Sequence, residues 1–100
     1  MTNSWRCQYT GHEIRVDNYW NLLLFGRERL YIDSNLVDET KGFLRFSSIL
    51  TATITRGDGS LARVWAYIHQ AKFGLAIGCK IWVDVEMIFD SEANQLPVEW

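Results

Sequence analysis

The sequence lacks the long apolar runs that mark membrane and exported proteins. Its longest uninterrupted apolar run, Phe73 to Cys79, has seven residues, whereas a membrane-spanning helix needs about 20. The polar start Met1 to Arg6 is not followed by an apolar segment, so it does not resemble a signal peptide. We therefore expect a soluble, cytoplasmic protein that does not bind a membrane.

Cysteine and histidine are also scarce. Cys7 and Cys79 allow at most one disulfide, and without an export signal we expect both as reduced thiols. With His12 and His69 they show no metal-ligand spacing, although a site assembled from these four side chains by the fold stays open. The residue four positions after His12 is Val16, not the second histidine of a zinc-peptidase motif. We predict no metal and no cofactor.

The chain also lacks a large excess of charge of either sign. The chain has 10 Lys and Arg against 12 Asp and Glu, a formal net charge of -2, and no block of like charges. Nothing in this distribution attracts a phosphate backbone or an anionic lipid surface. Neither nucleic acid nor membrane is expected as a partner.

Apolar and aromatic residues, in contrast, are abundant. They make up 48% and 14% of the 100 residues, which is too apolar for a disordered chain and enough for one core. No stretch repeats apolar residues at helical spacing over three turns, whereas many short segments alternate between apolar and polar residues. The sequence predicts one all-β domain over residues 1–100, an antiparallel β-sandwich or alternatively a closed or partly open small β-barrel.

The clearest alternation is in residues 50–55, where Leu50, Ala52 and Ile54 share one face and three threonines share the other. The sequence Arg56-Gly57-Asp58-Gly59 follows. Gly57 and Gly59 enter positive φ freely, so we predict a hairpin loop with Asp58 as a turn residue. Arg-Gly-Asp is also the tripeptide that integrins recognise, but in a chain without an export signal we interpret it as turn chemistry.

One apolar pattern occurs twice. Two segments align at a constant offset without a gap, and they match Leu30, Tyr31, Ile32, Asp33, Leu36 and Val37 with Ile81, Trp82, Val83, Asp84, Met87 and Ile88. We interpret them as equivalent β segments in two halves, about residues 5–42 and 43–90, followed by a tail over 91–100. The polar stretch Asp38 to Gly42 is predicted as a loop at the boundary between the halves.

The two copies differ at their centres. Asp33-Ser34-Asn35 has the chemistry of a turn. For Asp84-Val85-Glu86 two interpretations stay open, because the alignment predicts a turn while alternation predicts one continuous strand with Val85 and Met87 inward.

Asp33, Asp84 and Glu86 would form the acid and base of a hydrolase if their carboxylates shared one pocket. We interpret them instead as carboxylates at strand ends that accept hydrogen bonds from turn amides. No phosphate-binding loop, nucleophile elbow or Cys/His dyad accompanies them. A protein that is not an enzyme is expected.

Trp65, Tyr67 and Trp82 lie on faces opposite the aliphatic rows. A sandwich this small needs both inner faces filled, which favours the core for these rings. If their face is exposed, the rings form a contact patch for a protein or a sugar ring.

Trp5, the alternating segment His12 to Val16, and the paired segments Leu30 to Val37 and Ile81 to Ile88 together resemble the Fas apoptotic inhibitory molecule family over most of the chain. The resemblance implies a soluble β-sandwich that is a non-catalytic cytosolic interaction domain. We therefore expect a binding or regulatory module that contacts another protein, or alternatively a small ligand or carbohydrate in an aromatic-lined cleft. An exposed edge strand would also allow a homodimer.

Overall fold

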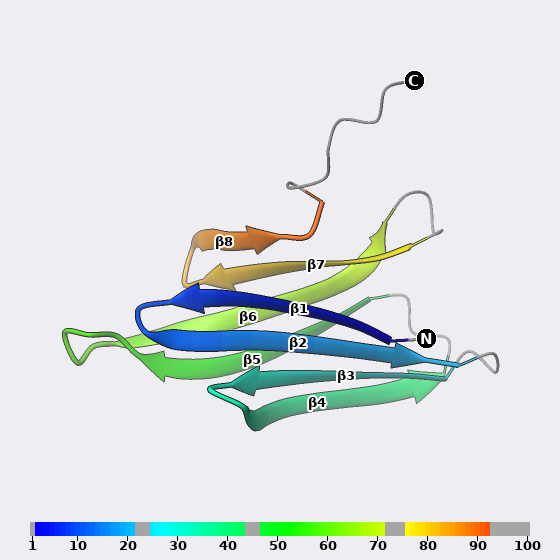
Figure 1. Ribbon diagram of the computed structural model, residues 1–100, viewed down its shortest axis with the longest axis horizontal. Coiled ribbons are helices and arrows are strands. Elements are labelled where there is room, and N and C mark those ends of the chain that lie inside the picture. The colour runs from blue at the N-terminus through cyan, green and yellow to red at the C-terminus, as the bar shows by residue number, and fades with distance from the viewer. Residues whose placement is uncertain (1, 22–24, 44–46, 72–75, 93–100) are drawn as a thin grey trace, which may run out of the picture.

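The computed structural model describes residues 2–21, 25–43, 47–71 and 76–92, which form two sheets (Figure 1). The first sheet contains β1 (Thr2–Tyr9), β2 (His12–Trp20), β3 (Phe25–Ile32) and β4 (Asn35–Phe43). The second contains β5 (Ser47–Thr55), β6 (Leu61–Ala71), β7 (Ala76–Val83) and β8 (Glu86–Asp90). The segments interpreted from sequence at Leu22 to Leu24, Leu44 to Phe46, Phe73 to Leu75 and from Ala93 onward lie outside the described residues.

Each sheet is an antiparallel meander, in which strands that follow one another in the chain are hydrogen-bonded neighbours. The orders are β1-β2-β3-β4 and β5-β6-β7-β8, so none of the described strands belongs to both sheets. Two separate sheets packed face to face confirm the predicted β-sandwich over the closed alternative. No helix in the described residues is long and apolar enough to cross a bilayer.

The core lies between the sheets and takes alternate side chains from both, because successive residues of a strand point to opposite faces. Its buried members are Ile14, Val16, Leu30 and Ile32 from the first sheet and Leu50, Ile54, Ala62, Val64, Ala66, Ile68, Cys79, Ile81 and Val83 from the second. Ala52 packs against them, so the predicted inward row of β5 is confirmed. Burying one side chain of the size of leucine or isoleucine contributes about 1.5–3 kcal/mol.

Three polar side chains are also buried, namely Asn18, Glu28 and Ser48. Asn18 and Glu28 are cross-strand partners on β2 and β3. The Ser48 hydroxyl donates a hydrogen bond to Glu28 Oε1 across the sheets, whereas Glu28 Oε2 has no hydrogen-bond partner among the described residues. The alternating pattern of β3 continues through Glu28, which is why a charged residue occupies an inward position.

Two hairpins turn at an aspartate with positive φ. The β3–β4 turn contains Asp33 and Ser34, with φ of 52° and 69°, so the predicted turn is confirmed. The β7–β8 turn contains Asp84, with φ of 54°, and Val85. Short Asx side chains tolerate this left-handed region because they bond the local backbone. Val85 is 98% exposed, so the alignment, and not continuous alternation, describes this segment.

Both turn aspartates make the same pair of hydrogen bonds to a neighbouring strand. The Asp33 N–H donates to the Glu13 carbonyl and the Glu13 N–H donates to Asp33 Oδ1, each at 2.9 Å. The Asp84 N–H donates to the Arg63 carbonyl at 2.8 Å, and the Arg63 N–H donates to Asp84 Oδ1 at 2.9 Å. Each carboxylate therefore satisfies a backbone amide, as expected for carboxylates at strand ends.

The predicted loop at Asp38 to Gly42 is wrong, because these residues belong to β4 and pair with β3. Polarity misled the prediction, since an edge strand exposes polar side chains to water without leaving its ladder. Asp38 Oδ2 accepts a hydrogen bond from the Thr51 N–H of β5 at 2.9 Å. This bond joins the edges of the two sheets and satisfies an amide of an edge strand.

His12 joins the sheets at the end that carries the β3–β4 turn. Its Nδ1 lies 2.6 Å from Asp33 Oδ2 and its Nε2 lies 2.8 Å from the Thr55 carbonyl oxygen of β5. Both neighbours are acceptors, so the ring donates from both nitrogens as an imidazolium. The bond to Asp33, and then the bond to Thr55, raise the pKa of His12 above its usual 6.5. The bond to His12, and then the amide of Glu13, lower the pKa of Asp33.

We expect this bridge to make stability depend on pH. The folded-state pKa of His12 is raised, so its contribution is fully present below about pH 6.5 and is lost as pH rises through the folded pKa. The folded-state pKa of Asp33 is lowered, so its contribution is present above its usual value and is lost as pH falls through the folded pKa. The effect is small because the His12 side chain is 26% exposed and water screens the pair.

The measurement is the free energy of unfolding in urea against pH for the wild type and for His12→Gln. The difference between the two proteins should shrink as the pH rises above neutrality. A difference that stays constant across that range would show that the imidazolium does not hold the sheets together.

Candidate functional site

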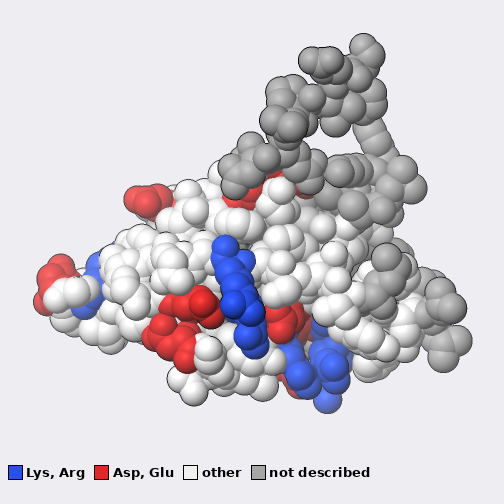
Figure 2. Space-filling model, in the orientation of Figure 1, with Lys and Arg blue, Asp and Glu red and all other residues white. Residues whose placement is uncertain are grey.

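The two outer faces of the sandwich differ in chemistry. On the first sheet, charged side chains of both signs alternate, as the face turned to the viewer in Figure 2 shows. Arg15 Nε lies 3.5 Å from Asp17 Oδ1, and the guanidinium carbon of Arg15 lies 4.0 Å from the centre of the Tyr31 ring. Arg29 forms an ion pair with Glu39. On this face, acidic and basic side chains are thus paired with one another.

The outer face of the second sheet brings aromatic rings together on neighbouring strands. Trp65 on β6 is the cross-strand partner of Trp82 on β7, and Tyr67 on β6 is the partner of Ile49 on β5. Trp65 is 39% exposed, and Tyr67 and Trp82 are partly exposed. The core placement that small size favoured is therefore wrong for these rings. Smaller aliphatic side chains of the same strands fill the space between the sheets.

These rings form the wall of an open groove of about 400 Å³, lined by Ile49, Trp65, Tyr67, Trp82 and Asp84. Apart from the Asp84 carboxylate, every lining side chain is largely apolar. Ile49 is 59% exposed on this face. Other apolar side chains are exposed as well, Leu36 and Tyr19 among them, but here an aliphatic side chain and three rings line one concave surface, which is the usual form of a binding site.

His69 and Gly78 set the position of Tyr67. The rings of Tyr67 and His69 stack with centroids 5.1 Å apart. His69 Nδ1 donates to the Gln70 carbonyl at 2.8 Å, and the ring lies over Gly78, where a Cβ atom would be 2.8 Å from His69 Cε1. The space beside Gly78 is thus filled by side chains and not by a neighbouring backbone.

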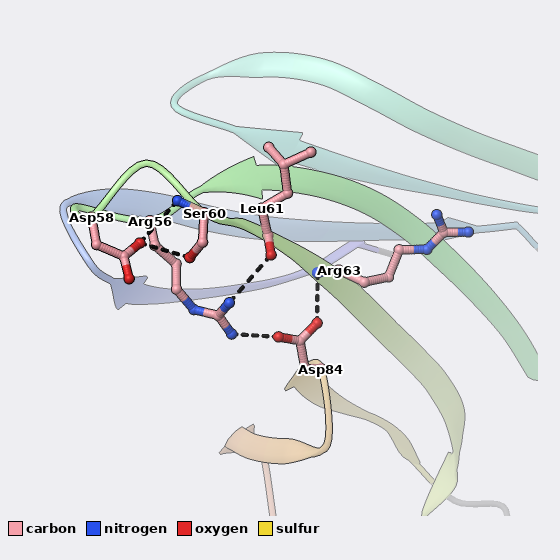
Figure 3. Close-up of polar contacts among 6 residues, drawn as sticks. All are labelled: Arg56, Asp58, Ser60, Leu61, Arg63 and Asp84. Atoms are coloured by element: carbon pink, nitrogen blue, oxygen red, sulfur yellow. Dashed lines mark hydrogen bonds and ion pairs between the residues drawn. The ribbon is translucent and has the colours of Figure 1, made fainter.

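Asp84 is the charged residue that lines the groove, and Figure 3 shows its contacts. Its Oδ1 accepts the Arg63 N–H and its Oδ2 pairs with the Arg56 guanidinium, which also donates to the Leu61 carbonyl at 3.2 Å. The Arg63 amide, and then Arg56, lower the pKa of Asp84. Bonds to Tyr9 and Asp84 raise the pKa of Arg56. Both carboxylate oxygens are thus engaged, and Asp84 stays ionised at neutral pH.

The three carboxylates of the hydrolase hypothesis do not line one pocket. Asp33 bonds His12 and the Glu13 amide on the first sheet, whereas Asp84 bonds Arg56 and Arg63 on the second. Glu86 is exposed at the start of β8 and does not line the groove. Asp33 and Asp84 both have a lowered pKa, which is the opposite of what a general acid needs.

The tripeptide Arg56-Gly57-Asp58 lies in the β5–β6 loop (Figure 3). Asp58 Oδ1 accepts bonds from the Ser60 amide at 2.9 Å and the Ser60 hydroxyl at 2.6 Å, and these bonds lower the pKa of Asp58. Gly59 has φ of 87°. The Arg56 side chain bonds Asp84 and the Asp58 side chain bonds Ser60, so both charged side chains of the tripeptide stabilise the loop.

Cys7 and Cys79 are free thiols, as predicted. Burial raises the pKa of Cys7 to about 11 and that of Cys79 to about 12. Both therefore stay protonated near neutral pH and are poor nucleophiles. Within the described residues, no group of three or more His, Cys, Asp and Glu side chains is arranged to hold a metal ion.

Two groove residues were missed from sequence. Ile49 follows the polar Ser47 and Ser48, but the alternation of β5 already placed it on the threonine face, opposite Leu50. This alternation was sufficient to predict that Ile49 shares a face with the aromatic side chains. Asp84 had the same kind of signal, because it follows Trp82 by two residues and alternation places both on one face, but it was considered only as a turn residue or as an acid or base.

Comparison with protein-family models, with curated proteins and with solved structures finds no match for this chain. The chemistry of the groove is therefore the basis for any statement about function.

Proposed function

We propose that this protein is a non-catalytic binding module and that the groove on the outer face of β5–β8 binds another protein. The observation that carries the proposal is the contrast between the two outer faces. One carries several ion pairs, and the other presents Ile49 and Trp65, 59% and 39% exposed, in one groove with two further rings. Aromatic anchors on a rigid strand give contact area at low entropic cost, as in the energetic centres of protein interfaces.

The lining favours an apolar protein side chain over a sugar. Sugar hydroxyls need hydrogen-bond partners, but the one charged lining group, Asp84, already bonds Arg56 and the Arg63 amide. A carbohydrate remains the second candidate because three aromatic rings lie on one open face, where a sugar ring can stack. Titration with a glycan panel, monitored by tryptophan fluorescence, tests it, and no response to any glycan would exclude it.

Site-specific crosslinking tests the main proposal. A photoreactive phenylalanine analogue replaces Ile49 in the full chain, and a control protein carries it in place of Gln8, an exposed residue on the other sheet. In a lysate of the source cell, we expect a discrete crosslinked protein from position 49 only. Excess wild-type chain should suppress that product, and excess Trp65→Ser chain should not. Equal products from both positions, or none that depend on Trp65, would contradict the proposal.

We also propose that the two sheets are copies of one four-stranded unit. The support is geometric, since the β3–β4 and β7–β8 hairpins share a turn aspartate with positive φ and the same strand contacts. Each hairpin also has a register shift one residue after a fully buried side chain, between Leu30 and Tyr31 in one and between Ile81 and Trp82 in the other. Such a bulge increases the local twist at an edge. In this arrangement, the aromatic groove described above belongs to the second copy.

A further inference from the structure

We infer that the partner segment presents a carboxylate beside the apolar side chain that enters the groove, an inference that rests on the proposed function. The surface contains two cations next to the rings, Arg63 and Lys80, and neither has an ionic partner among the described residues. An acidic and apolar peptide segment is the occupant that matches both features.

Of the two cations, Arg63 is the one that contacts a ring of the groove. It precedes Trp65 by two residues on β6, so both side chains leave the same face of the sheet. Its guanidinium carbon lies 5.4 Å from the centre of the Trp65 ring. Figure 3 shows the side chain extending away from Asp84, which bonds the Arg63 backbone and the Arg56 side chain. A guanidinium stacked on a ring keeps its N–H groups free for a carboxylate.

Lys80 on β7 lies directly across from Tyr67 on β6. Its other cross-strand partner is Asp90 on β8, but Asp90 Oδ1 accepts the Glu92 N–H at 3.0 Å. No ion pair joins Lys80 to Asp90 in the described part of the chain. Thus Arg63 lies beside the Trp65 ring, and Lys80 is the cross-strand neighbour of Tyr67.

Charge complementarity follows from this placement. The chain has a formal net charge of -2, and the groove carboxylate Asp84 is engaged, yet the cations beside the rings are not. A two-fold contact between copies through this face would bring Arg63 and Lys80 of both copies into one interface, where like charges repel. Single-stranded nucleic acid can stack on aromatic rings, but it needs a longer track of cations than these two.

The experiment is a selection of displayed random peptides on the full chain, with Ile49→Ser as the counter-selection. Ile49 is 59% exposed, so this change leaves the core intact. Peptides that require Ile49 are then measured by fluorescence anisotropy on the wild type, Arg63→Gln, Arg63→Lys and the control Arg6→Gln, an exposed arginine on the other sheet. Sedimentation of the wild type and binding of a labelled thymidine oligonucleotide complete the set.

We expect the selected peptides to carry Asp or Glu beside an apolar residue. Their affinity should fall about tenfold or more in Arg63→Gln, recover in part in Arg63→Lys and stay unchanged in Arg6→Gln. Selected peptides that require Ile49 but contain no acidic residue, and whose affinity is unchanged in Arg63→Gln, would overturn this inference. They would still support the proposed function. A failure to select any peptide that needs Ile49 would contradict both.

Two other results would replace the partner class. A wild-type dimer that Ile49→Ser dissociates would make a second copy the occupant of the groove. Tight binding of the oligonucleotide that Arg63→Gln abolishes would make the occupant a nucleic acid. Either result overturns the inference of an acidic peptide segment.

Discussion

Replacing Leu30 with alanine is expected to lower the free energy of unfolding by about 3–5 kcal/mol. Leu30 on β3 is 0% exposed and packs between the sheets, so truncation removes buried methyl groups and leaves a cavity. Typical domains are stable by only about 5–15 kcal/mol, so this single change removes a large part of the total.

Urea unfolding, monitored by tryptophan fluorescence, measures the effect. The matched control is Leu36→Ala, because Leu36 is the same residue type but is 51% exposed on β4, and its truncation should cost far less. If Leu30→Ala does not fold, Ile81→Val removes one methylene group from an equally buried site on the other sheet and should cost about 0.5–1.5 kcal/mol. Equal losses for Leu30 and Leu36 would contradict the described core.

Replacing Gly78 with alanine is expected to cost about 1–3 kcal/mol, through overpacking rather than through a cavity. The new Cβ would lie 2.8 Å from Cε1 and 3.0 Å from Nε2 of His69. The His69 ring cannot move easily, because it bonds the Gln70 carbonyl and stacks on Tyr67. We therefore expect Tyr67 to shift as well, which would weaken binding at the groove.

Gly57→Ala provides the control, because a Cβ at Gly57 meets no atom within 4 Å and the residue does not have a positive φ. That variant should keep wild-type stability in the same urea experiment. A Gly78→Ala protein as stable as Gly57→Ala, with unchanged tryptophan fluorescence, would show that His69 does not pack over the backbone of β7 as described.

Much of the fold was predictable because the pattern of a strand is local. The alternation of Leu50, Ala52 and Ile54 identified β5 and its inward face, and the loop at Arg56 to Gly59 identified the hairpin that follows. The match of Asp33 with Asp84 predicted the β7–β8 turn, which alternation alone had placed inside a strand. Composition misled the prediction at Asp38 to Gly42, because a polar edge strand and a loop have similar residues.

The candidate site was predictable only in part. Trp65, Tyr67 and Trp82 were assigned to one kind of face from their spacing, and the structure brings them together in one groove. Asp84 joins them there, two residues after Trp82 and at the β7–β8 turn, but its contacts with Arg56 and the Arg63 amide depend on tertiary structure that no spacing indicates.

The sequence by itself determined which side chains share a face, because the period of a strand is two and needs no knowledge of neighbours. It did not determine which face is inside when both are apolar, as on β6, where Val64 and Ala66 alternate with Trp65 and Tyr67. Tertiary packing decided that question, since aliphatic side chains from both sheets already fill the space between them and leave the rings outside. Contacts between sheets, such as His12 with Thr55, also depend on how the sheets stack, which no local pattern encodes.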